Sequence, residues 1–143
     1  MTSFEDKKVL VAEDSETMRM FILFNLIKML PGVKITEAEN GAVALEKLAK
    51  LDVDLILTDM NMPVLDGAGL IRGVRNALKR DTPIVVITTK GEDKDRERGL
   101  ALGANGYITK PLDPHQFKET LMKYLWKGGL SGEYNPRKTI LLF

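Results

Sequence analysis

The residues in this chain that could carry chemistry fall into four groups, each at the end of an apolar run. The groups are an acid pair, a lone aspartate, a threonine and a lysine: Glu13-Asp14, Asp59, Thr88 and Lys110. Carboxylates gathered in one place repel one another and stay ionised only beside a cation. Oxygen donors without His or Cys favour Mg²⁺ before Ca²⁺ or Mn²⁺, and Mg²⁺ readily shares phosphate oxygens. The set therefore predicts a site for a phosphoryl group on Asp59, with Thr88 donating a hydrogen bond and Lys110 supplying positive charge.

Each of these residues also has an ordinary structural explanation. Glu13-Asp14 suits a solvated turn with a helix cap, and Asp59 suits the turn that follows its strand. Thr88 is a common strand residue, and Lys110 alone would be a surface lysine. Their order favours the chemical interpretation, because unrelated surface residues would rarely close strands one, three, four and five in turn.

Five apolar or β-branched runs supply the strands that must position these groups. The runs are Lys7–Ala12, Val33–Ala38, Leu55–Leu57, Pro83–Thr89 and Gly106–Thr109. Helical patterns alternate with them across short connections, which is typical of a parallel sheet with helices on both faces. We expect one α/β domain, a doubly wound (βα)5 fold with a five-stranded parallel sheet. In such folds the site lies at the carboxyl ends of the strands.

Capping residues mark where several of the predicted helices begin. Ser15 or Asp14 can cap the first helix, and Asp66 can cap the third. Asp113-Pro114 is a strong start for the last helix, since Asp suits the cap position and Pro the first helical position.

The first and fourth predicted helices differ in their apolar support. In the first, helical spacing predicts an inward face made of Met18, Phe21, Ile22, Asn25, Leu26, Met29 and Leu30. The fourth, within Gly91–Gly103, is rich in charge and has only Leu100-Ala101-Leu102 to pack. We expect it to be loosely held and low in local stability.

Composition excludes several classes of function. The chain has 143 residues, a net charge of +1, no cysteine and one histidine. The charge gives no case for nucleic-acid or membrane binding, and disulfides, thiolate chemistry and multi-histidine metal centres are excluded. No apolar run approaches the roughly 20 residues of a membrane span, and the first residues lack the apolar region of a signal peptide. A cytoplasmic protein is the expectation.

Four motifs occur together in one order and spacing. They are VLVAEDSETMR (Val9–Arg19), DLILTDMNMPVLDG (Asp54–Gly67), PIVVITT (Pro83–Thr89) and GANGYITKP (Gly103–Pro111). In these motifs the sequence resembles response-regulator receiver domains, especially the stand-alone chemotaxis regulators of CheY type. The resemblance implies a flavodoxin-like, CheY-like fold over residues 1–127.

By that resemblance Asp59 is the phosphoacceptor, which takes a phosphoryl group from a sensor histidine kinase or from acetyl phosphate. Glu13, Asp14 and Asp59 hold Mg²⁺, for which Mn²⁺ can substitute, and the Asn61 backbone carbonyl adds a ligand. Glu13 stands where the family commonly has Asp. The implied protein is a two-component signalling switch, acting in chemotaxis or motility. It assists only its own phosphorylation and dephosphorylation and is no enzyme with an external substrate.

The resemblance also implies how the switch works. Thr88 moves toward the phosphoryl group, and Tyr107, matching the family's rotating aromatic residue, fills the vacated space. The surface of the fourth helix, fifth strand and fifth helix then changes for a downstream target: a motor, a phosphatase or an output module. Asn61 and Lys90 lie where they would tune dephosphorylation, although a solvated loop lysine is an equal alternative for Lys90. Both a monomer and a phosphorylation-dependent dimer remain open.

Three alternatives compete with this interpretation. The chain could be the receiver input domain of a multidomain transcription factor or enzyme. A phosphohydrolase working through an aspartyl-phosphate commonly has a second Asp two residues after the nucleophile, where this chain has Asn61. A flavin carrier of similar fold is disfavoured because no Gly/Ser/Thr-rich phosphate loop follows the first strand.

The last residues depart from the alternating pattern. Residues 128–143 contain three glycines and a proline and end in the apolar sequence TILLF. We expect a C-terminal extension, either flexible or packed, in which TILLF covers the domain, pairs with a sheet edge or opens a further domain.

Overall fold

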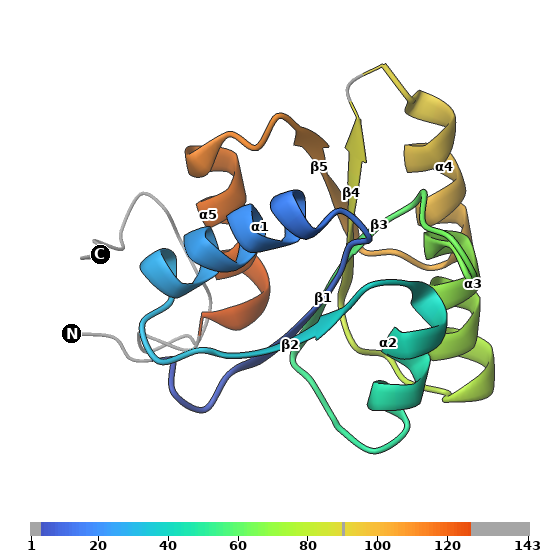
Figure 1. The fold of residues 1–143 in the computed structure, drawn as a ribbon, viewed down its shortest axis with the longest axis horizontal. Helices are drawn as coiled ribbons and strands as arrows, with labels where there is room; N and C mark the ends of the chain where they lie inside the picture. Colours follow the sequence, from blue (N-terminus) through green and yellow to red (C-terminus); the bar gives the residue numbers. More distant parts are fainter. Residues whose placement is uncertain (1–3, 90, 127–143) are drawn as a thin grey trace.

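Five parallel strands form one sheet in the computed structural model, which describes residues 4–89 and 91–126. They are β1 (Lys8–Ala12), β2 (Lys34–Ala38), β3 (Leu55–Asp59), β4 (Ile84–Thr89) and β5 (Gly106–Lys110). Their order across the sheet is β2-β1-β3-β4-β5 (Figure 1). This order places β3 at the centre, where an unbroken apolar strand is buried on both faces. The less apolar β2 lies at an edge.

Helices cover both faces of the sheet. They are α1 (Glu16–Met29), α2 (Gly41–Leu48), α3 (Gly67–Arg72) with a π-helical turn η1 (Gly73–Ala77), α4 (Asp93–Leu102) and α5 (Pro114–Leu125). Helices α1 and α5 pack on one face, and α2, α3 and α4 lie on the other (Figure 1). The predicted doubly wound (βα)5 architecture is confirmed.

The predicted capping residues start their helices. Ser15 Oγ accepts a hydrogen bond from the Met18 amide (3.2 Å), which settles the choice between Ser15 and Asp14. Asp66 Oδ1 accepts from the Gly69 amide (2.8 Å), so Asp66 caps α3 as predicted. An added Cβ on Gly67 would lie 2.4 Å from the Asp59 backbone oxygen. Only glycine therefore lets α3 approach β3 this closely.

Helix α1 differs from its prediction on one face. Ile22, Leu26 and Met29 are buried as expected, but Phe21 is exposed, so its predicted inward position is wrong. Phe24 is 66% exposed and belongs to the same outward apolar stripe. The helix is apolar on nearly every side, and apolar periodicity alone cannot then choose the face that is buried.

Two predicted features fall outside the described residues: Lys90 and the C-terminal extension 128–143. Within residues 4–89 and 91–126, no helix is long and apolar enough to cross a membrane.

The loop between β3 and α3 contains a strained residue. Val64 has a φ of +68° and is 82% exposed. The Leu65 amide donates to the Pro63 carbonyl (2.8 Å), closing a three-residue turn centred on Val64. Such a turn is rare and costly for a β-branched residue.

We expect Val64→Gly to raise the free energy of unfolding by about 1 kcal/mol, because relief of the strained φ outweighs the extra freedom of the unfolded chain. Urea denaturation measures it. Val33→Gly serves as the control, because Val33 does not belong to the described residues with positive φ, and it should lower the free energy of unfolding. A loss of stability in Val64→Gly equal to that in the control would contradict strain at this turn.

Candidate functional site

Three carboxylates meet at the carboxyl end of the sheet. One oxygen from each of Glu13, Asp14 and Asp59 lies within 4.8 Å of the others. Glu13 is buried, Asp59 is half-buried and Asp14 is exposed. Because β1 and β3 are neighbouring parallel strands, the residues that end them must converge at this edge. The structure thus brings together the three acids that the sequence singled out.

The Lys110 side chain extends from the end of β5 to these acids. Its Nζ lies 3.0 Å from Glu13 Oε1 and 3.3 Å from Asp59 Oδ2. Burial alone would lower the pKa of Lys110, but its hydrogen bond to Glu13 and the charges of Asp59 and Glu13 outweigh burial and raise the pKa. Lys110 is therefore a cation held beside Asp59, as the sequence predicted for this strand end.

Glu13 is the acid whose charge the fold tolerates least. Its side chain is 2% exposed. Burial raises the pKa of Glu13 to about 7, with Asp59 adding to the effect and Lys110 opposing it. Its Oε2 is buried and has no hydrogen-bond partner. A hard cation among the three carboxylates would supply that missing partner, so the donor set fits Mg²⁺.

The turn that carries the acid pair is held by Arg19 of α1. Its Nη1 donates to the Glu13 backbone carbonyl (2.7 Å), and its Nε donates to Glu37 Oε1 at the end of β2 (3.0 Å). Arg19 thereby fixes the backbone from which Glu13 and Asp14 project. The sequence showed Arg19 within a motif, but its spacing gave no sign of this contact.

Thr88 and Lys110 line one cavity beside the acids. Its volume is about 430 Å³, and its walls come from the ends of β4 and β5, the loops that follow them, and the starts of α4 and α5. Thr88 is buried, and its partner in the β4–β5 register is Thr109. The cavity gives the predicted hydroxyl and the predicted cation a shared open space.

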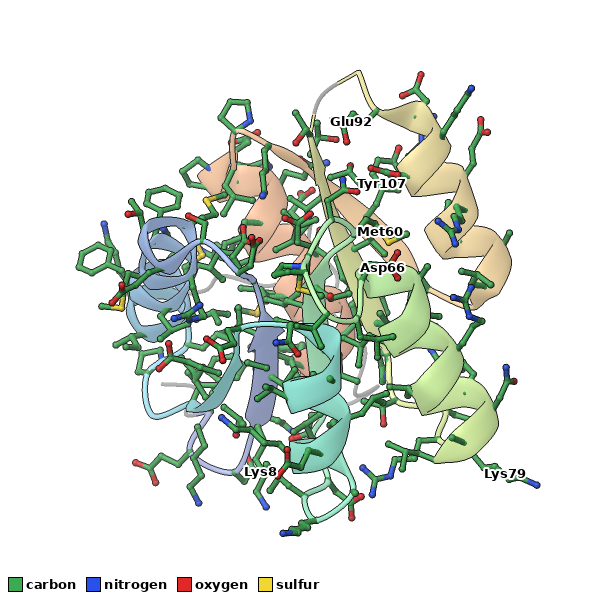
Figure 2. All side chains as sticks on the ribbon, turned by 45° about the vertical axis from the view of Figure 1, so that its right-hand side comes forward. Lys8, Met60, Asp66, Lys79, Glu92 and Tyr107 are labelled. Carbon is green, nitrogen blue, oxygen red and sulfur yellow. The ribbon has the colours of Figure 1, made fainter. Side chains whose placement is uncertain are left out.

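Tyr107 does not join this cavity. Its side chain is 38% exposed, and the Arg96 guanidinium lies 4.9 Å from the centre of its ring. Figure 2 shows Tyr107 on the side of the sheet that α4 covers. The predicted switch residue is thus outward in this structure, held by a cation–π contact that sequence reasoning did not find.

Asn61 links the acids to α4. Its backbone amide donates to Asp59 Oδ1 (3.3 Å). Its side-chain Nδ2 donates to Asp95 Oδ2 (2.8 Å) and to Glu92 Oε2 (3.3 Å). A hydrogen bond with Asp95, followed by burial and the charges of Asp95 and Asp59, raises the pKa of Glu92.

Sequence reasoning did not assign Glu92 and Asp95 to the site. The one feature of the sequence that could have pointed to them is their spacing, since they are two acids three residues apart at the start of a predicted helix. That pattern also suits a solvated helix N-terminus, where acids are favoured by the helix dipole.

Comparison with known proteins agrees with this fold and geometry. The sequence profile described as "Response regulator receiver domain" matches residues 9–122. The chain is 40% identical to the chemotaxis protein CheY1 of Helicobacter pylori over 116 residues, covering 80% of this chain and 93% of that protein. It is 33% identical to the transcriptional regulatory protein ResD of Bacillus subtilis, covering 100% of this chain but only 59% of ResD.

Solved structures show the same likeness. The chemotaxis response regulator CheY4 of Vibrio cholerae has a TM-score of 0.73 and 33% identity, covering 83% of this chain and 98% of that one. The receiver domain of the sensor histidine kinase PA1611 from Pseudomonas aeruginosa has a TM-score of 0.75 and 28% identity, covering 83% and 97%. The PA1611 structure is described with a magnesium ion coordinated in its active-site cleft.

This chain belongs to the response regulator receiver domain family. It is the CheY-like receiver domain of a two-component response regulator. Receiver domains of this type are signalling switches rather than conventional enzymes, they bind Mg²⁺ in an acidic pocket, and they interact with histidine kinases and downstream targets.

The pKa of Glu13 predicts how stability depends on pH in EDTA. The folded pKa, about 7, lies above the ordinary value of 4.5, so the unfolded chain loses this proton first. The stability that Glu13 contributes is complete below the lower value and is lost as pH rises through the upper one. Wild type should lose on the order of 2 kcal/mol relative to Glu13→Gln between about pH 5 and about pH 8. Urea denaturation measures the free energy of unfolding of both proteins. If the difference between wild type and Glu13→Gln stayed constant across this pH range, the raised pKa of Glu13 would be contradicted.

Proposed function

We propose that this receiver domain is phosphorylated on Asp59 in a Mg²⁺-dependent reaction with a sensor histidine kinase. The observation that carries the proposal is the position of the Asp59 carboxylate. It lies at the end of the central strand, 3.3 Å from Lys110 and within 4.8 Å of two further carboxylates. Phosphoryl transfer depends mainly on alignment and on neutralising charge, and this arrangement supplies both.

The chain's own residues have distinct parts in the transfer. An Asp59 carboxylate oxygen forms a bond to phosphorus while the bond from phosphorus to the histidine nitrogen breaks, leaving the histidine to take up a proton. Lys110 neutralises charge on the phosphoryl oxygens, and the Thr88 hydroxyl donates a hydrogen bond to one of them. Glu13, Asp14, Asp59 and the Asn61 backbone carbonyl would hold a Mg²⁺ ion, which would further neutralise charge on the phosphoryl oxygens.

Phosphorylation then changes the output surface through Thr88 and Tyr107. Thr88 moves toward the new oxygens, and Tyr107 turns inward into the space that Thr88 leaves. An inward turn would move the ring away from Arg96, whose guanidinium lies 4.9 Å from the ring centre in this structure. The surface of α4, β5 and α5 presents the change to a target protein.

The likeness to CheY proteins supports a role in chemotaxis or motility, with a motor or phosphatase as target. The likeness to ResD supports a second candidate, a receiver that serves as input domain for a separate output module. Asn61 argues against an aspartyl-phosphate hydrolase, because its amide cannot act as acid or base and is bound to α4. Residues 1–127 form the receiver domain in either case, as a monomer or a phosphorylation-dependent dimer.

Intact-mass measurement after incubation with acetyl phosphate tests the acceptor. Wild type with Mg²⁺ should gain one phosphoryl group, and Asp59→Asn, or wild type in EDTA, should gain none. Lys110→Ala should react about a hundredfold more slowly, because a preorganised charge on the phosphoryl oxygens is lost. Lys50→Ala, which removes an exposed lysine from the turn that follows α2, serves as the matched control.

If Asp59→Asn still gained a phosphoryl group, another residue would be the acceptor. If wild type gained none, a thermal shift with beryllium fluoride, which mimics a phosphoryl group, would decide the matter. No shift there would overturn the proposed function, whereas a shift absent from Asp59→Asn would show a site that rejects this particular donor.

A further inference from the structure

Helix α4 is attached to the domain by very little apolar surface. Gly99 is the one buried residue among Asp93–Leu102. An added Cβ there would lie 2.9 Å from Val86 Cγ2 and 3.5 Å from Met60 Sδ. Figure 2 places Met60 on the side of the sheet that faces α4. The helix therefore rests on the sheet through a glycine, and polar contacts at its two ends must contribute to holding it.

The C-terminal end of α4 is held by Arg75 of η1. Its guanidinium donates to the Gly103 carbonyl from Nε (3.1 Å) and Nη2 (2.9 Å), and to Asn105 Oδ1 from Nη2 (2.9 Å). Asn105 Oδ1 in turn accepts from the Ile84 amide at the start of β4 (2.8 Å). Gly103 has a φ of +119°, so the chain turns sharply where this anchor lies. This end is fixed far from Asp59.

The N-terminal end of α4 is held by Asn61, which lies beside Asp59. One residue thus contacts the Asp59 carboxylate through its backbone amide and the first turn of α4 through its side chain. Met60, the residue between Asp59 and Asn61, lies next to Gly99 of the same helix, with its Sδ 3.5 Å from where a Cβ on Gly99 would be. A change at Asp59 therefore reaches α4 through the two residues that directly follow it.

We propose that the hydrogen bonds from Asn61 to Glu92 and Asp95 form a latch that charge on Asp59 releases. The inference rests on the proposed function, in which Asp59 carries a phosphoryl group. That group adds negative charge and strong acceptors beside two carboxylates. Repulsion between the phosphoryl group and the carboxylates of Glu92 and Asp95 weakens their hydrogen bonds with Asn61. The phosphoryl oxygens also compete with these carboxylates for the side-chain amide of Asn61. The first turn of α4 leaves the site while Arg75 retains the other end, so α4 moves as a lever.

Two sets of variants separate the holding of α4 from its release. Asp95→Ala removes the shorter hydrogen bond; its control is Asp93→Ala, which removes an acid from the same turn. The double variant Glu92→Gln/Asp95→Asn keeps oxygen acceptors for Asn61 but removes both charges. Its control, Asp93→Asn/Glu97→Gln, makes the same change in helix charge at positions for which the described structure gives no hydrogen bond with Asn61.

Hydrogen–deuterium exchange of the α4 amides, measured by mass spectrometry, is the readout. Without ligand, Asp95→Ala should exchange about threefold faster than wild type, while Asp93→Ala stays near wild type. Beryllium fluoride with Mg²⁺ should accelerate α4 exchange about threefold or more in wild type and in the Asp93→Asn/Glu97→Gln control. The Glu92→Gln/Asp95→Asn variant should show less than half of that response, because nothing repels the helix.

Equal exchange in Asp95→Ala and Asp93→Ala would overturn the latch. A full response in Glu92→Gln/Asp95→Asn would overturn its release by charge. A thermal shift of wild type by beryllium fluoride, absent in Asp59→Asn, reports separately on the proposed function. If that shift fails, the proposed function and the release fall together, while the comparison without ligand still decides whether Asn61 holds α4.

Discussion

Repulsion among carboxylates at the end of the sheet is the constraint on which the rest of this structure depends. Parallel strands force Glu13 and Asp59 to the same edge, and burial of Glu13 makes the cost of its charge high. Lys110 offsets part of that cost and remains charged because of it. The repulsion is therefore only partly offset by the residues of the site, and a cation is the kind of ligand that would offset the rest.

The strand β3 and the helix α4, which both adjoin that site, differ in how firmly they are packed. The central strand β3 is buried along its length and cannot move without breaking the core. Helix α4 has one buried residue, a glycine, one partly buried leucine, Leu102, against the core, and polar contacts at its two ends. We therefore expect a change of charge at Asp59 to leave its own strand in place and to act on the helix beside it. The strained turn at Val64 lies in the connecting loop, where such strain commonly collects.

Sequence alone predicted the elements whose signals are local or periodic. The strands, the caps at Ser15 and Asp66, and the fourth helix with its sparse burial follow from apolar runs, side-chain chemistry and composition. The convergence of Glu13, Asp14 and Asp59 followed from one topological rule, since each ends or follows a parallel strand. Phe21 was misplaced because α1 is apolar almost all round, which leaves no periodic contrast. The contacts of Arg19 and Asn61 join residues far apart in the chain, and no local pattern encodes them.

The outward apolar stripe of α1 makes one side of the molecule apolar, whereas the side that carries α4 is charged. Helix α1, which carries the exposed Met20, Phe21, Phe24 and Ile27, lies across the sheet from the charged α4 (Figure 1). Added salt screens the carboxylates of α4, and salts excluded from protein surfaces strengthen the tendency of apolar groups to leave water. Adding such a salt thus weakens the electrostatic interactions of the α4 side and strengthens the apolar association of the α1 side. The solubility of this protein should accordingly be governed by α1 at high ionic strength and by its charged side at low ionic strength.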